Sequence, residues 1–226
     1  MAIEERWKMI YLARRNPALA PEDFPQAWRE HSALGRQCRN VQDKVTGVRQ
    51  CSRVLDRPGV PSGASTDYDG VNLLSLRDRQ AADDIWNDEE TLRIMRPDEP
   101  RVFSTYVRDF TLVAQEQVLR AGEETGVCLA LFLRAAPDQV LSAEDFGAPA
   151  SVWQEARRLV WNTVSGNCPP GYEYDVILEV WYDSADAVAR AFGDAPVWAQ
   201  LPGSLSKEID AVRSVCMLTH VTHRRP

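Results

Sequence analysis

The stretch Lys8–Gln37, KMIYLARRNPALAPEDFPQAWREHSALGRQ, joins a short apolar run, a turn and an amphipathic segment. Its first part, Lys8–Arg14, predicts a β-strand, and Asn16-Pro17 predicts the turn that follows. Pro21–Asp23 predicts a helix start, because proline suits the first helical turn and acidic residues there complement the helix dipole. The chain is therefore expected to open with a strand and a helix.

The rest of the first half extends this opening into a longer pattern. We expect strands at 44–55, 68–76 and 102–113, with a second helix at 79–94. The resulting order, βαββαβ, is that of the ferredoxin-like motif.

The second half repeats the pattern less clearly. We expect strands at 127–134, 172–182 and 212–222, helices from 142 to about 160 and at 184–201, and a poorly marked strand near 160–166. Matching pairs of residues support a duplication: Asp23-Phe24 with Asp145-Phe146, Tyr68-Asp69 with Tyr174-Asp175, and Pro17 with Pro137. The expected units are residues 1–113, a linker at 114–125, and a degenerate second unit at 126–226.

A four-stranded sheet covered by helices on one face leaves its other face bare. Such an exposed apolar face is unstable in water, and a second sheet can cover it. We therefore expect an α+β fold in which two ferredoxin-like βαββαβ repeats form one intramolecular, pseudo-dimeric α/β barrel, with a cavity between the sheets.

Composition narrows the possible partners of this 226-residue chain. Its net charge of −7 argues against a broad nucleic-acid surface, which needs clustered lysine and arginine. No apolar run approaches the roughly 20 residues that span a bilayer, and we expect neither a signal peptide nor membrane association. Five widely spaced cysteines favour reduced thiols, so we expect a cytoplasmic protein.

Three motifs carry a resemblance to a known family. The helix pattern Phe24-x3-Trp28-Arg29-Glu30-His31 closely resembles that of EthD-domain proteins, which belong to the dimeric α/β-barrel superfamily. Tyr68-Asp69-Gly70-Val71 and the segment Pro97–Phe103 are similar to further parts of that family. In the second half Trp153 stands seven residues after Phe146 and no histidine follows, so a site built on His31 is expected only once.

His31 is the first candidate for chemistry. Phe24, Trp28 and His31 share one helix face, and a histidine there can exchange protons near neutral pH. The alternative is a histidine packed in the core. If Ile10 and Leu12 pack under the helices, Tyr11 points into the cavity between the sheets; it is otherwise ordinary barrel lining.

The remaining candidates complete the expected site. We expect His31, Tyr11 and Asp109 as catalytic residues, and the substrate-binding residues Trp28, Phe24, Arg14, Tyr106 and Trp86. No spacing of histidine, cysteine or acidic residues matches a metal site, and no glycine-rich cofactor motif is present, so we expect neither metal nor cofactor. His220 and His223 are interpreted as part of a polar tail.

The resemblance implies a class of reaction rather than one reaction. It indicates a cofactor-independent lyase, dehydratase, decarboxylase or cyclase acting on an aromatic or polyketide-like molecule through His31. The alternative is a non-catalytic binding or accessory protein for a hydrophobic intermediate of an oxygenase pathway. Haem or oxygen-radical chemistry is a third hypothesis. We expect a small hydrophobic or aromatic partner, and the fused barrels can form a homodimer.

Overall fold

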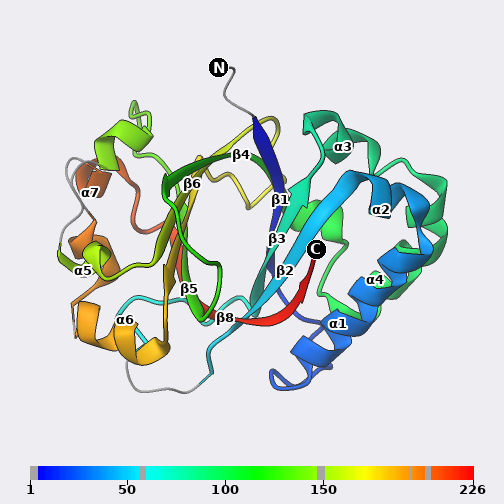
Figure 1. The fold of residues 1–226 in the computed structure, drawn as a ribbon, viewed down its shortest axis with the longest axis horizontal. Coiled ribbons are helices and arrows are strands. Elements are labelled where there is room, and N and C mark those ends of the chain that lie inside the picture. Colours follow the sequence, from blue (N-terminus) through cyan, green and yellow to red (C-terminus); the bar gives the residue numbers. More distant parts are fainter. Residues whose placement is uncertain (1–4, 56–59, 147–150, 194, 202–204) are drawn as a thin grey trace.

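Eight antiparallel strands close into a barrel in the computed structural model, which describes residues 5–55, 60–146, 151–193, 195–201 and 205–226 (Figure 1). The strands are β1 (Arg6–Ala13), β2 (Val45–Arg53), β3 (Gly70–Leu76), β4 (Thr111–Arg120), β5 (Val127–Leu133), β6 (Arg158–Val164), β7 (Val176–Tyr182) and β8 (Val215–Arg225). Around the barrel they follow the order β1-β3-β2-β8-β5-β7-β6-β4. The expected α+β class and α/β barrel are confirmed.

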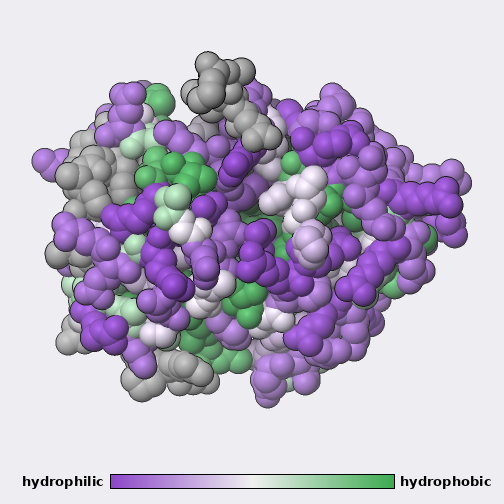
Figure 2. Space-filling view, in the orientation of Figure 1, coloured by the Kyte–Doolittle hydropathy of each residue, from purple (hydrophilic) through white to green (hydrophobic). Residues whose placement is uncertain are grey.

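Helices cover the barrel on two opposite sides (Figure 1). One side carries α1 (Phe24–Leu34), α2 (Arg39–Lys44), α3 (Arg79–Asp84) and α4 (Glu99–Val102); the other carries α5 (Ser151–Gln154), α6 (Ala185–Phe192) and α7 (Leu205–Glu208). None of the described helices has the length and apolar character needed to span a bilayer. The face shown in Figure 2 is mostly hydrophilic, with small hydrophobic patches.

The two halves of the chain contribute four neighbouring strands each, in the matching orders β4-β1-β3-β2 and β8-β5-β7-β6. Each half also contains the same aspartate contact. The Arg15 N–H donates to Asp69 Oδ2 (2.9 Å), and the Ala135 N–H donates to Asp175 Oδ2 (2.7 Å). Pairing of β2 with β8 and of β4 with β6 joins the halves, so neither half keeps an open sheet edge.

The barrel interior is filled with side chains. Lys8, Ile10 and Leu12 alternate with residues that face the helices, and all three are buried. Lys8 Nζ lies 2.6 Å from both Glu116 Oε2 and Glu179 Oε1, so β1 is tied to β4 and, across the barrel, to β7. Burial works to lower the pKa of Lys8, but the charges of Glu179 and Glu116 raise it above its usual value.

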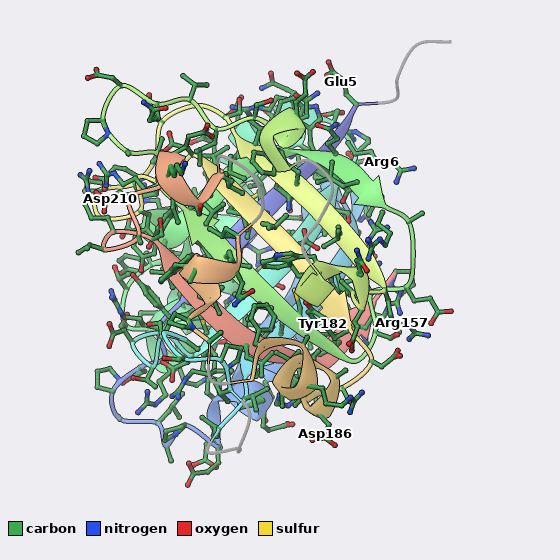
Figure 3. All side chains as sticks on the ribbon, turned by 90° about the vertical axis from the view of Figure 1, so that its left-hand side faces the viewer. Glu5, Arg6, Arg157, Tyr182, Asp186 and Asp210 are labelled. Carbon is green, nitrogen blue, oxygen red and sulfur yellow. The ribbon has the colours of Figure 1, made fainter. Side chains whose placement is uncertain are left out.

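The outer face of the second half is apolar. Leu131, Leu178 and Trp161 pack beneath the helices with Trp153 and Phe192. Figure 3 views this half, in which the Tyr182 ring contacts Phe192 of α6 with a centroid separation of 6.4 Å. This packing leaves the second half with a continuous hydrophobic core.

Some predicted elements have different bounds in the structure. The expected strand at 102–113 begins only at Thr111, because α4 ends at Val102 and a 3₁₀ turn occupies Val107–Phe110. β4 then continues to Arg120, so residues 114–120 of the expected linker are strand residues paired with β6. The ends of a strand depend on the neighbouring strands with which it pairs, and local sequence does not show which strands these are.

The predicted helices are also shorter than expected. The helix expected from 142 to 160 gives way to a 3₁₀ turn at Ala143–Phe146, α5 and then β6, while residues 147–150 lie outside the described part. The helix at 79–94 ends as α3 at Asp84, before a π-helical turn at Thr91–Met95. The helix at 184–201 is reduced to α6 and a 3₁₀ turn at Val197–Gln200.

Candidate active site

A narrow cavity of about 60 Å³ lies between the helices of the first half and the outer face of its sheet. Its polar lining comprises Tyr11, His31, Ser32, Gln50, Asn72, Thr91, Glu99 and Arg225. Trp28 and Trp86, with aliphatic neighbours, supply the apolar walls. The free space has room for a few water molecules, so an aromatic ring can enter only if the lining side chains move apart. The cavity was expected between the two sheets, but the Lys8 ion pairs and core side chains fill that space.

Strand register produces the polar floor of the cavity. Tyr11 of β1 lies opposite Asn72 of β3, and Asn72 lies opposite Gln50 of β2. Residues directly opposite on neighbouring antiparallel strands share a face, so the three side chains form a row toward the helices. Gln50 and Asn72 are 1% and 4% exposed, yet Gln50 Oε1 and Asn72 Oδ1 have no hydrogen-bond partner among the residues that the structure describes.

His31 is held by an ion-paired aspartate. Its Nδ1 lies 3.0 Å from Asp98 Oδ2, and the ring packs edge-on against Phe103. Arg101 donates to both oxygens of Asp98, at 2.7 and 3.1 Å. A carboxylate beside Nδ1 favours a proton on that nitrogen, which leaves Nε2 as an acceptor. His31 can therefore act as a base.

Burial governs the proton affinity of this pair. His31 is 5% exposed, and burial lowers its pKa below 6.5 although Asp98 acts in the opposite direction. Partial burial works to raise the pKa of Asp98, but Arg101 and His31 hold it below its usual value. At neutral pH the imidazole is therefore uncharged beside an ionised carboxylate.

A second acid lies at the same cavity. Glu99 is 3% exposed, and burial raises the pKa of its carboxyl although the Val107 N–H donates to Oε2 at 2.8 Å. The pKa of Tyr11 is also raised, first by burial and then by the charge of Glu99. The Tyr11 hydroxyl therefore keeps its proton at neutral pH and can donate a hydrogen bond.

Three of the expected residues meet at the cavity with His31. Trp28 stacks on Phe24 with a centroid separation of 5.0 Å and lines the cavity, as do Trp86 and Tyr11. Tyr11 reaches it from the face opposite to that of Ile10 and Leu12, which point into the barrel. Phe24 lies behind Trp28 in the core and packs on Phe103.

The other expected residues lie elsewhere. The Arg14 guanidinium lies over the Tyr68 ring, 4.1 Å from its centroid. Tyr106 is 42% exposed, with Arg96 over its ring. Asp109 is on a 3₁₀ turn rather than a strand, where it pairs with Arg108 and accepts a hydrogen bond from Thr105. None of the three lines the cavity, and for Tyr106 and Asp109 the reason is that the chain from 102 to 110 is not a strand.

Sequence reasoning missed several polar residues of the cavity, among them Gln50, Asn72 and Glu99, and it missed Asp98, which pairs with His31. The two acids stand in the segment Pro97–Phe103, whose similarity to EthD proteins assigns no role to its carboxylates. Asn72 interrupts an otherwise apolar strand face, a signal for a buried polar function, whereas Gln50 shares its strand with other polar residues. Their convergence required the register of three strands.

The second half has apolar residues at the matching positions. Tyr11 stands four residues before Arg15, and Leu131 stands four before Ala135, the residue with the same aspartate contact. Opposite Leu131 is Leu178, and opposite Leu178 is Trp161. In the described residues the polar row therefore belongs to the first half.

Comparisons with known proteins identify the fold. No protein-family model matches the chain, and no curated protein matches it. Among solved structures, an anthrone oxidase-like protein aligns over 99% of this chain and 94% of its own, with 14% identity and a TM-score of 0.60. The chain has a dimeric α/β-barrel fold.

Two further structures agree. A candidate monooxygenase from Fusobacterium nucleatum subsp. nucleatum aligns over 100% of this chain and 95% of its own, with 8% identity and a TM-score of 0.57. A second candidate monooxygenase, from Lactobacillus acidophilus NCFM, aligns over 97% of this chain and 95% of its own, with 8% identity and a TM-score of 0.52. Identities this low establish the architecture alone. Within the described residues, no three histidine, cysteine or acidic side chains are grouped to hold a metal ion.

Proposed function

We propose that the protein is a cofactor-independent enzyme that acts on a small aromatic or polyketide-like molecule, with His31 as its general base. The observation that carries the proposal is the His31–Asp98 pair at a tryptophan-lined cavity with two buried, unpartnered amide oxygens. Buried polar atoms are normally satisfied, so unpartnered ones at a cavity point to a ligand.

The proposed first step is proton removal from a carbon next to a carbonyl group. His31 Nε2 takes the proton, and the ionised Asp98 stabilises the imidazolium that forms. The enolate oxygen accepts a hydrogen bond from the Tyr11 hydroxyl, whose raised pKa keeps it protonated at neutral pH. Arg101 acts as a positioning residue because it fixes both oxygens of Asp98.

The fate of the enolate distinguishes two reaction classes. Elimination of a leaving group or ring closure onto a second carbonyl makes the protein a lyase, dehydratase or cyclase. The names of the structural neighbours, an oxidase-like protein and candidate monooxygenases, favour a second candidate in which the enolate reacts with molecular oxygen. Both classes share the proton removal by His31.

We also propose that the chain is an EthD-type protein made of two ferredoxin-like repeats. The equal strand orders and the paired Asp69 and Asp175 contacts support the duplication. The motif around Trp28 and His31 supports the family.

Hydrogen–deuterium exchange tests the proton removal that both reaction classes share, and it does not require knowledge of the natural substrate. Anthrone and 2-tetralone, whose methylene protons are acidified by a carbonyl group, are incubated with the protein in D₂O and followed by NMR. We expect catalysed exchange in the wild type, loss in His31→Gln, and normal rates in His220→Gln, whose histidine lies outside the cavity. Oxygen consumption separates the two reaction classes.

Equal exchange rates in wild type and His31→Gln would overturn the assignment of His31. Ligand binding measured by tryptophan fluorescence, without exchange of any ketone, would instead favour the non-catalytic binding protein.

A further inference from the structure

A group of basic residues stands at the rim of the cavity. We call Arg29, Arg36, His223 and Arg225 the rim cluster. Arg29 belongs to α1, Arg36 to the 3₁₀ turn Gly35–Gln37, and the other two to β8. Three separate segments of the chain, one of them from the second half, thus place positive charge at one location.

Register explains how the end of β8 reaches the cavity. His223 lies opposite Gln50 and Arg225 lies opposite Val48, so both share the face of the polar row. Arg225 itself lines the cavity, and its guanidinium lies close to Gly35 at the end of α1. Arg29 donates to the Thr222 carbonyl at 3.0 Å, which joins α1 to the same strand.

The rim cluster has no counter-charge. In the part of the chain that the structure describes, none of its members has a carboxylate within ion-pair distance, whereas nearby Arg101 pairs with Asp98 and Glu30. Burial lowers the pKa of His223, and the charges of Arg29, Arg225 and Arg36 lower it further. Burial and Arg36 likewise lower the pKa of Arg225. In a protein of net charge −7, this repulsion is a specific local feature.

We propose that the rim cluster binds the carboxylate of an aromatic acid whose ring enters the cavity between Trp28 and Trp86. Arg225 is half-buried and presents a planar fork of donors that matches a carboxylate. A hydroxyl on the ring donates to Gln50 Oε1 or Asn72 Oδ1, the unpartnered acceptors of the floor. This inference rests on the proposed function only in placing the ligand in the same cavity.

Binding of matched probes tests the proposal by calorimetry. Salicylate and its neutral amide, salicylamide, share ring and hydroxyl and differ in the anionic group; phenyl phosphate tests a phosphate as the anionic group. The variants are Arg225→Gln and the control Arg224→Gln, which removes the same charge from the next residue, on the opposite strand face.

We expect salicylate to bind more tightly than salicylamide and its affinity alone to fall with added salt. Arg225→Gln should weaken salicylate binding about tenfold and leave salicylamide binding unchanged, since a hydrogen bond to a charged group is lost. Arg224→Gln should bind both like the wild type. Equal affinities for acid and amide, equal effects of the two variants, or no binding of either probe would overturn the proposal.

Two further arms separate this inference from others. Tighter binding of phenyl phosphate with the same dependence on Arg225 would overturn the carboxylate assignment in favour of a phosphate. Proton exchange reports on His31, and the comparison of salicylate with salicylamide reports on Arg225, so a failure of the proposed chemistry leaves this binding result intact.

Discussion

At the scale of single residues, surroundings rather than residue type decide what His31 can do. Its ring is buried against Phe103, which favours the neutral form, while Asp98 orients it through Nδ1. The sequence allowed either an acid/base histidine or one packed in the core. The structure combines the two, since the ring is packed and also lines a cavity.

The acid limb of the pH–rate profile reports the protonation of His31. Because the pKa of His31 lies below 6.5, the base form predominates at pH 7. We expect the rate of proton exchange to rise with pH, with the midpoint of the rise below pH 6.5, and to fall in His31→Gln on the order of 10²-fold or more.

Asp98→Asn sharpens this prediction. The variant removes the hydrogen bond and the charge that raise the pKa of His31, so the acid limb should move to lower pH. A limb that stays in place in Asp98→Asn, or that persists in His31→Gln, assigns the titration to another group.

Asn72→Leu separates ligand binding from stability. Removing a buried acceptor that lacks a partner relieves a desolvation penalty, so the variant should be as stable as the wild type or more stable by about 1 kcal/mol. Salicylate binding should weaken. The control is Asn162→Leu, since Asn162 Nδ2 donates to Glu179 and to the Ile177 carbonyl.

Thermal unfolding checks both variants. We expect Asn162→Leu to be destabilised by about 1–3 kcal/mol, because it leaves two buried acceptors short of a donor. A comparable loss in Asn72→Leu would mean that Asn72 is a structural residue.

At the scale of elements, the distance between α1 and the sheet shapes the cavity. Gly70 begins β3 directly beneath Trp28, and a Cβ at this position would lie 2.5 Å from the Trp28 ring and 3.0 Å from the Cys51 carbonyl oxygen. The glycine in the Tyr68–Val71 motif is thus required by the close approach of the tryptophan. The two motifs that resemble EthD proteins are in contact in the folded protein.

Gly70→Ala should push α1 away from the sheet. We expect a loss of about 1–3 kcal/mol in the free energy of unfolding, as for other overpacked sites, and weaker ligand binding. Gly47→Ala is the control, since its Cβ would have no neighbour closer than 3.4 Å. Urea denaturation measures the free energy of unfolding of both variants. Equal values for Gly70→Ala and Gly47→Ala would show that the Trp28 ring moves aside without cost.

At the scale of the whole molecule, a buried charge cluster joins the two halves. Lys8 comes from the first half and Glu179 from the second, and Glu179 also accepts hydrogen bonds from Asn162 and Trp181. The side chains of Lys8 and Glu179 are 4% and 0% exposed. Breaking such a pair leaves a buried charge without compensation.

Lys8→Met should therefore destabilise the protein by about 3–5 kcal/mol. The raised pKa of Lys8 stabilises the folded protein. This stabilisation is complete below pH 10.5, the pKa of an unperturbed lysine, and is lost as the pH rises through the pKa of Lys8 in the folded protein. The pKa of Glu116 is lowered by Lys8 against the effect of burial, so its contribution is present above 4.5 and lost as pH falls.

The difference in the free energy of unfolding between wild type and Lys8→Met should thus be largest between pH 4.5 and pH 10.5. Urea unfolding at pH 4 and pH 7 checks it, with the exposed Lys207→Met as control, expected within about 0.5 kcal/mol of wild type. A difference of the same size at both pH values would contradict the electrostatic account.

Local sequence was enough to predict the α+β class and the helix that carries Trp28 and His31, because both depend on local periodicity and on turn and capping residues. The tertiary structure alone decided that β4 extends through the expected linker, that Tyr11 faces the helices, and that Asp109 lies apart from His31. It also brought Gln50, Asn72, Asp98 and Glu99 together, since strand register and barrel closure join residues that are distant in the chain. The alternation of a strand shows which residues share a face, but only the packed barrel decides which face is inside.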